Sequence, residues 1–211
     1  MATHPTRATP LPPAERREAL IEATVPLLMK HGTDVTTKQL AQACGVAEGT
    51  LFRAFPDKES LIGAAIGRAF DPAPLLAELA ALDRQAPLEE RLIGVVRILI
   101  GRFSRTIALL NAVRLGGGDP RPVMRHAARH AGGKNDAHCA APDHERINAL
   151  IIDGIADVIA GEADQLRCTP REAGRLLRLL VFSGIHPGIS GGPALSEEQI
   201  IDFLLNGVRS C

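Results

Sequence analysis

The sequence contains no tryptophan and no tyrosine, and its six phenylalanines leave aromatic residues at only 3% of the chain. A hydrophobic core must therefore consist mainly of Leu, Ile, Val and Ala, a composition that suits packed helices. Hydrophobic residues make up 45% and charged residues 23% of the 211 residues, which is within the range of globular proteins. A chain of this length can form one small domain and one larger domain, each with its own core.

Cysteine pairs and long apolar runs are also lacking. The four cysteines, Cys44, Cys139, Cys168 and Cys211, are widely spaced and include no C-x-x-C pair, so the sequence predicts neither a disulfide framework nor a zinc knuckle. No stretch reaches the roughly 18 uncharged apolar residues of a membrane helix. Residues 1–13 hold four prolines and no apolar run of signal-peptide length. We therefore expect a cytoplasmic protein with no membrane partner and a flexible N-terminal arm over residues 1–13.

Catalytic patterns are missing as well. No G-x-S-x-G, H-E-x-x-H or paired-carboxylate spacing occurs, so nothing in the chain indicates a nucleophile or a general base. The glycine run at 116–118 lacks the Lys and Ser/Thr of a phosphate-binding loop and predicts a turn. We expect a binding protein and not an enzyme, with no cofactor.

Charge of either sign is not in excess. The net charge is zero, and the first sixty residues contain seven Lys or Arg and seven Asp or Glu. A nucleic-acid-binding protein usually has a basic surface. Such a role would therefore depend on a few charges placed on one surface, together with helix N-termini that hold phosphates.

Helical periodicity is present along almost the whole chain, and no run alternates apolar and polar residues over the length of a strand. The sequence therefore predicts an all-α fold. Pro26 should kink the first helix, and the second long helix can be interrupted near Ser104. The helices are expected at about 14–30, 37–44, 47–52, 58–70, 75–85, 88–115, 143–165, 170–186 and 196–210.

Two domains are expected, because a proline-rich boundary, Asp71-Pro72-Ala73-Pro74, follows the fourth helix. The first domain covers residues 14–70 and the second covers 71–211. Within the second domain, residues 116–142 are rich in Gly, Pro and His and predict a long irregular connection.

The short helices at 37–44 and 47–52 carry the most informative pattern. Thr36 is a good N-cap for the first of them, and Gly45 permits a sharp turn between the two. Leu40, Val46 and Leu51 are spaced to close on a shared core, which predicts a compact helix-turn-helix. In such a unit the first helix lies on the DNA backbone and the second presents its exposed face to base edges in the major groove.

Residues 14–70 resemble the TetR family of transcriptional regulators, whose pattern is T-T-x-x-[IL]-A-x-x-x-G-V-x-x-x-T-L-Y-x-x-F-x-x-K. Two positions depart from it: Phe52 replaces the usual Tyr, and Ala47 replaces a Ser that commonly caps the second helix. The resemblance implies an N-terminal three-helix helix-turn-helix DNA-binding domain followed by a helical-bundle domain for ligand binding and dimerisation. The matching residues are Thr36, Thr37, Leu40, Ala41, Gly45, Val46, Thr50, Leu51, Phe55 and Lys58.

Carried over by position, the resemblance implies two groups of DNA contacts. Phosphate contacts are expected from Thr37, Lys38 and Lys58. Side chains of these types can bond phosphates, base edges or both, and a glycine lets the backbone approach the groove. Thr36 is instead expected to cap the helix at 37–44, and Phe55 is expected to lie in the core. The groove contacts are expected from Glu48, Gly49, Thr50, Phe52 and Arg53.

The last two helices carry more apolar surface than packing on one core requires. We therefore expect them to form the interface of a homodimer, which the resemblance also implies and which a palindromic operator requires. The expected interface residues are Leu176, Leu179, Leu180, Ile200, Phe203 and Leu204.

The implied function is that of a repressor released from its operator by a small-molecule effector. The helices between 75 and 160 carry apolar residues and few internal charges, so an apolar or weakly polar compound is expected. Phe103, Arg97 and Asn111 are candidates for its site, with Arg102 and Arg105 as further polar anchors.

Two alternatives remain open. His126, His130, His138, Cys139 and His144 lie close together in sequence, and a His126-x3-His130 pair on a helix could chelate a divalent metal, which would make the protein a metal-responsive regulator. A mobile, solvated loop explains the same cluster, and no metal site is assigned. The second alternative is a helical ligand carrier with a degenerate helix-turn-helix.

Overall fold

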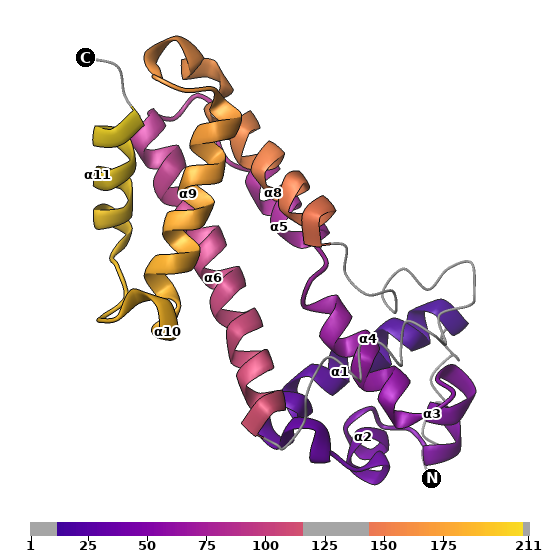
Figure 1. The fold of residues 1–211 in the computed structure, drawn as a ribbon. Coiled ribbons are helices and arrows are strands. Elements are labelled where there is room, and N and C mark those ends of the chain that lie inside the picture. Colours follow the sequence, from indigo (N-terminus) through magenta and orange to yellow (C-terminus); the bar gives the residue numbers. More distant parts are fainter. Residues whose placement is uncertain (1–11, 116–143, 209–211) are drawn as a thin grey trace, which may run out of the picture. The chain divides into compact units, whose positions relative to one another are not determined.

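The computed structural model describes residues 12–115 and 144–208, and these residues form helices without a strand (Figure 1). The chain divides into two compact units. In the described residues, the first unit comprises 12–68 and 109–115, and the second comprises 69–108 and 144–208. The expected all-α fold is confirmed. In the described residues, no helix is both long enough and apolar enough to cross a membrane.

The first unit contains four α-helices and a short 3₁₀ turn. Helix α1 (Pro13–His31) packs against α2 (Thr37–Ala43), α3 (Glu48–Ala54) and α4 (Lys58–Arg68), and η1 (Gly32–Asp34) follows α1 directly. Helix α1 continues through Pro26. The core is built mostly from aliphatic side chains, as the composition predicts. Its fully or almost fully buried members are Leu20, Ile21, Leu28, Val35, Leu40, Leu51, Phe55, Leu61, Ile62 and Ile66.

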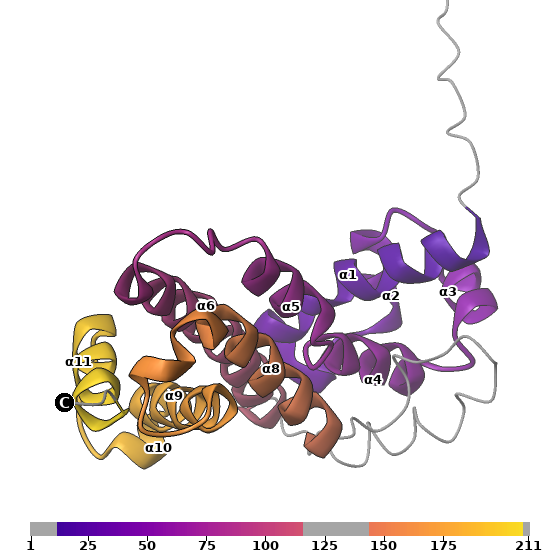
Figure 2. The ribbon, with the colours of Figure 1, turned by 90° about the horizontal axis from the view of Figure 1, so that it is seen from above.

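The second unit is a bundle in which α9 (Pro170–Ile185) lies between α8 (His144–Ile159) and α11 (Glu197–Val208), as Figures 1 and 2 both show. Gly174 allows α9 to approach α8 closely, because a Cβ atom there would lie 3.1 Å from the backbone oxygen of Ile152. The other elements are α5 (Ala73–Ala80), α6 (Leu88–Leu115), η2 (Ala160–Gln165) and α10 (Pro187–Ser190).

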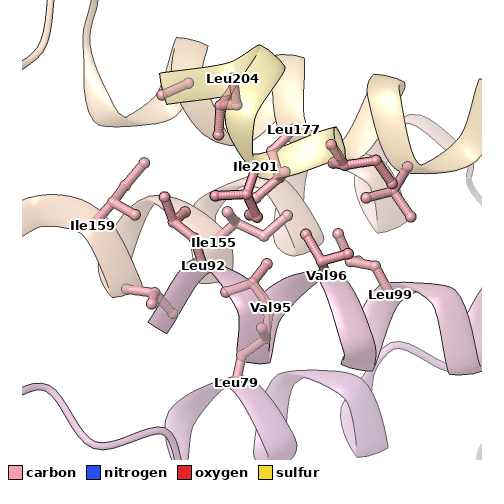
Figure 3. Packing of buried hydrophobic residues seen from close by; sticks show 14 of the residues in the cluster. Leu79, Leu92, Val95, Val96, Leu99, Ile155, Ile159, Leu177, Ile201 and Leu204 are labelled. Atoms are coloured by element: carbon pink, nitrogen blue, oxygen red, sulfur yellow. The ribbon is translucent and has the colours of Figure 1, made fainter. Parts of the chain in front are cut away.

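One apolar cluster holds the second unit together (Figure 3). Val95 and Leu99 of α6 are completely buried, and they meet Leu177 of α9 and Ile201 of α11 across the bundle. Full burial of an aliphatic side chain of this size contributes about 2 kcal/mol. The core of the bundle is therefore shared by residues of α6, α9 and α11.

Several helix boundaries differ from those expected. Helix α6 is continuous through Ser104. Helix α5 begins at Ala73, two residues earlier than expected, and ends at Ala80, five residues earlier than expected. The earlier start is possible because proline is tolerated in the first turn of a helix. After the end of α5, the Asp83 carboxylate accepts a hydrogen bond from the Gln85 amide at 2.8 Å, and such a local bond competes with helix formation.

The region after α8 also differs. The chain continues from Ile159 as the 3₁₀ helix η2, where one α-helix to 165 was expected. The glycine- and proline-rich segment after α9 forms the short helix α10, where a loop was expected, and the ring Nδ1 of His186 accepts a hydrogen bond from the Gly188 amide at its start.

Candidate nucleic-acid interface

Helix α2 begins at a capping box. The Thr36 hydroxyl accepts a hydrogen bond from the Gln39 amide at 3.2 Å, and the Gln39 side chain accepts one from the Thr36 amide at 2.8 Å. Two amides that a helix start leaves without partners are thereby satisfied. Thr36 is therefore a cap, as expected, and the seven-residue helix has a fixed start.

The turn between α2 and α3 depends on Gly45, whose φ of +64° is rare for residues with a side chain. The Val46 amide donates to the Ala41 carbonyl at 3.0 Å and closes the turn. Leu40 and Leu51 are buried on either side of it. The two short helices therefore form one rigid helix-turn-helix.

Helix α3 presents one exposed face. Glu48, Gly49, Phe52 and Arg53 are exposed, Thr50 is half-buried, and Leu51 lies in the core. The Phe52 ring is 49% exposed, although aromatic rings are usually buried in a domain of this size. The exposed face of α3 (Glu48, Gly49, Phe52 and Arg53) is therefore available to a partner.

Arg17 of α1 holds the far end of α3, a role that no sequence pattern predicts. Its Nη1 donates to the backbone oxygen of Ala54 at 2.6 Å, and its guanidinium lies 4.0 Å from the centroid of the Phe55 ring. A cation at a helix C-terminus and over an aromatic ring is stabilising on both counts. In the sequence Arg17 is indistinguishable from its neighbour Arg16.

The expected contacts on α2 and α4 are partly engaged within the protein. The Thr37 hydroxyl donates to the Glu48 carboxylate at 3.2 Å, which ties the start of α2 to the start of α3. Lys58 is half-buried and donates to the backbone oxygen of Thr33 at 3.2 Å. Because an ammonium group has three donors, this bond leaves Lys58 able to contact a phosphate. Lys38 is exposed.

The start of α3 lacks a side-chain cap, since Ala47 at the N-cap offers no acceptor. The Thr50 amide bonds to the Ala47 carbonyl at 2.8 Å. The first amides of a helix are a ready binding site for phosphate or another acceptor. The departure from the family pattern at Ala47 therefore leaves backbone donors at the exposed start of α3.

Gly49 offers a way to separate folding from binding. A Cβ atom at this position would meet nothing within 4 Å, so the fold does not require glycine there. We expect Gly49→Ala to stabilise the protein by up to about 1 kcal/mol through helix propensity. If α3 lies in the major groove as the sequence predicts, the added methyl group separates its backbone from the bases, and we expect operator affinity to fall roughly tenfold.

Thermal melting and fluorescence anisotropy with labelled operator measure the two effects. Gly101→Ala in α6 is the matched control, because a Cβ atom there also meets nothing within 4 Å. It should stabilise the protein to a similar extent and leave operator affinity unchanged. Unchanged affinity in Gly49→Ala would mean that α3 does not approach DNA through this residue.

The six residues expected at the dimer interface differ in their exposure to solvent. Ile200 and Leu204 are at most 3% exposed and belong to the core of their own subunit, so they are not available to a second copy. Leu180 is half-buried against the same core. By contrast, Leu176, Leu179 and Phe203 are 38%, 44% and 74% exposed. The exposed apolar face of α9 and α11 (Leu176, Leu179 and Phe203) is the part that remains free.

The three residues expected around a ligand do not come together. Phe103 is buried in the core cluster, whereas Arg97 is exposed and its Nε donates to the Glu197 carboxylate at 2.7 Å. Asn111 is exposed on the part of α6 that belongs to the first unit. An open groove of about 330 Å³ between α6 and α11 contains none of the three; its lining residues include Glu89, Ile93, Glu198, Ile201, Asp202 and Leu205.

The histidine-rich cluster lies outside the described residues, apart from the backbone of His144 at the start of α8. Within the described ranges, no group of His, Cys, Asp or Glu side chains could hold a metal ion. The cysteines described here, Cys44 and Cys168, are not in a disulfide, and burial raises the pKa of both thiols.

A capped first helix, a glycine turn and a second helix with one exposed face define a helix-turn-helix domain, here joined to an all-helical second unit. Residues 20–65 match the model of the family described as "Bacterial regulatory proteins, tetR family". The HTH-type transcriptional repressor KstR of Mycolicibacterium smegmatis is 31% identical over 94 residues, which are 44% of this chain and 44% of KstR. The alignment thus spans less than half the length of this curated relative.

Solved structures extend the likeness of the fold to the second unit. A TetR-family transcriptional regulator from Mesorhizobium loti is 16% identical with a TM-score of 0.64, over 95% of this chain and 100% of that one. The Flavonoid-responsive Regulator FrrA is 20% identical with a TM-score of 0.54, over 93% and 98%. Residues 20–65 are therefore similar in sequence to the matched part of tetR-family regulators, and the whole chain is similar in fold to these solved structures.

Proposed function

We propose that this protein is a homodimeric transcriptional repressor that binds a roughly palindromic operator and releases it when a small-molecule effector binds. The observation that carries the proposal is the exposed face of α3, which the capping box of α2, the Gly45 turn and Arg17 hold in a fixed position. A rigid, exposed, seven-residue helix is suited to the major groove. With DNA as the partner, we also propose that the protein acts in the cytoplasm.

The DNA contacts follow from the exposed side chains. Arg53 can bond a guanine edge or a phosphate, and Glu48 can accept from cytosine N4. Phe52 offers apolar contact to a thymine methyl group, and Gly49 admits the backbone. Lys38, Lys58 and the first amides of α3 supply phosphate contacts. The Thr37 bond to Glu48 orients the carboxylate before DNA binds.

Dimerisation is supported by the exposed apolar face of α9 and α11. Leu176 and Leu179 lie one turn apart on α9, and Phe203 lies on the neighbouring helix α11, so these exposed apolar side chains are the candidates for contact with a second copy. Two subunits related by a twofold axis present two copies of α3 to half-sites about 34 Å apart.

Release by an effector is inferred from the resemblance to TetR-family regulators and from FrrA, a flavonoid-responsive regulator with a similar fold. A ligand acts by binding more tightly to the conformation whose α3 spacing does not match the operator. We propose binding, not catalysis, as the role of the second unit. The ligand-carrier alternative is less favoured, because each part of the helix-turn-helix is intact.

Selection of bound sequences from a random DNA pool tests the proposal most directly. We expect an enriched motif with twofold symmetry and with half-sites about one helical turn apart. Anisotropy titration with the enriched duplex and with a scrambled duplex then gives the specificity ratio. Enrichment of no motif, or equal affinity for both duplexes, would contradict the proposal.

The salt dependence of operator binding tests the phosphate contacts. The slope of log K against log salt is negative, and each lost phosphate contact reduces its magnitude by about 0.9. Lys38→Ala should therefore reduce the magnitude of the slope by about 2 in a dimer that uses both half-sites. Lys30→Ala is the control, because Lys30 is also an exposed lysine of the first unit but lies in the last turn of α1. A slope that falls equally in both variants would remove Lys38 from the interface.

A further inference from the structure

Arg178 of α9 is a half-buried cation with an incomplete set of partners. Its Nη2 donates to the side-chain oxygen of Asn148 on α8, and its guanidinium carbon lies 5.7 Å from the centroid of the Phe103 ring on α6. The Nε atom is buried and has no hydrogen-bond partner among the described residues. A buried donor without a partner is costly.

Arg178 also has no counter-charge among the residues that the structure describes. In the described part of the second unit, Arg91, Arg97 and Arg171 each pair with a carboxylate, whereas no described carboxylate pairs with Arg178. Burial lowers the pKa of the Arg178 guanidinium from its ordinary value. Because arginine nevertheless keeps its proton in proteins, the group holds a positive charge where water solvates it poorly.

Aromatic surface lies directly beside this charge. Phe182 is one turn after Arg178 on α9, and its ring meets that of Phe103 edge to face with centroids 5.6 Å apart. The ring of His186, one further turn along, lies 5.7 Å from that of Phe182. Phe182 and His186 are half-buried, so part of this aromatic row is accessible.

We propose that Arg178 and Asn148 anchor the carboxylate of an amphipathic effector whose apolar body lies along the accessible rings of Phe182 and His186. The free Nε–H and the remaining Nη–H groups form a planar fork that matches the two oxygens of a carboxylate. Because the single positive charge of Arg178 is balanced by one negative charge, a monocarboxylate is favoured as the ligand. The inference rests on the proposed function in that it names the effector's class, and it replaces Arg97 by Arg178 as the anchor.

The probe pair cinnamate and cinnamamide tests the proposal, because the two differ in charge and share an apolar aryl body. Side-chain NMR of the full chain labelled with ¹⁵N-arginine observes the Nε–H group directly, and the spectrum of Arg178→Gln assigns the Arg178 signal. We expect millimolar cinnamate to shift this signal saturably. Cinnamamide should bind roughly tenfold more weakly or not at all, because it cannot form the charge-assisted fork.

Calorimetric titration of variants supplies the second measurement. Arg178→Gln should lose cinnamate binding, Arg178→Lys should retain only part of it, and Arg175→Gln should bind like the parent, since Arg175 is exposed on the same helix. An Arg178 signal that cinnamate leaves in place, or equal binding of both probes, overturns the inference. If Arg178→Gln does not fold, the spectrum of Arg178→Lys assigns the Arg178 signal, because lysine also lacks the Nε–H group, and the NMR titration of the parent protein then decides.

Both measurements use the protein without DNA. A chain that binds cinnamate at Arg178 but selects no operator retains the inferred site and contradicts the proposed function. A chain that selects an operator but does not bind cinnamate retains the proposed function and contradicts the inferred site.

Discussion

Replacing Leu179 and Phe203 together by aspartate is expected to convert dimers into monomers and to lower operator affinity by about 100-fold or more. These side chains are 44% and 74% exposed, so charge on them leaves the subunit's own core intact. In a dimer, the four introduced carboxylates would be buried without partners, which is prohibitive. A monomer then binds one half-site without the gain in effective concentration that the second half-site provides.

Light scattering coupled to gel filtration measures the oligomeric state, and anisotropy measures operator affinity. Leu150→Asp is the matched control, because Leu150 is 39% exposed but lies on α8. It should leave the mass and the affinity unchanged. A parent protein that is monomeric at micromolar concentration, or a monomeric variant with full operator affinity, would contradict the dimer proposal.

Two of the residues expected at the dimer interface, Ile200 and Leu204, belong to the core instead, and the helical pattern of the sequence could not distinguish the two locations. Ile200 and Leu204 lie on the apolar side of α11, and a helical wheel shows only that this side is wide. It does not show which part of the apolar arc faces the neighbouring helix. Figure 3 shows that Ile201 and Leu204 point towards α6, and Ile200 is fully buried. Phe203, on the other side, is left in solvent.

The helix-turn-helix could be predicted because its determinants are local. The Thr36 cap, the Gly45 turn and the apolar spacing of Leu40 and Leu51 all act within about fifteen residues, and each is found in its expected place. Arg17 could not be predicted, because its bond to Ala54 joins residues 37 positions apart. Nothing in the local sequence distinguishes an arginine that makes such a contact from one that does not.

Arg178 shows the same limit in the second unit. On a helical wheel Arg171, Arg175 and Arg178 share one stripe of α9, at separations of four and three residues, so the sequence does not distinguish them. The fold separates them, because Arg171 pairs with Asp153 of α8 while the guanidinium of Arg178 turns towards Phe103 and Asn148. Only the tertiary contacts of α9 with Asn148 of α8 and Phe103 of α6 decide which arginine is half-buried. A ligand anchor of this kind is a tertiary feature.

The second large effect is expected at Arg91, the most deeply buried charged residue described. Its side chain is 4% exposed; Nη1 donates to the backbone oxygen of Val158 at 2.6 Å, and Nη2 pairs with the Glu162 carboxylate. The pair joins the first turn of α6 to the end of α8 and to η2. We expect Glu162→Met to lower the free energy of unfolding by about 3–5 kcal/mol, because it leaves a buried guanidinium without a counter-charge.

Arg91→Met should cost less than Glu162→Met, about 2–3 kcal/mol, because the Glu162 side chain is 23% exposed and can recover part of its hydration. The double variant Arg91→Met with Glu162→Met should be more stable than Glu162→Met alone, because it leaves no isolated charge and places apolar side chains against the Ile159 region of the core. Urea unfolding followed by far-UV circular dichroism at one protein concentration measures all four proteins, since the chain has no tryptophan or tyrosine for fluorescence. Additive losses in the double variant would show that the two groups do not interact in solution, and that the bond to Val158 alone fixes Arg91.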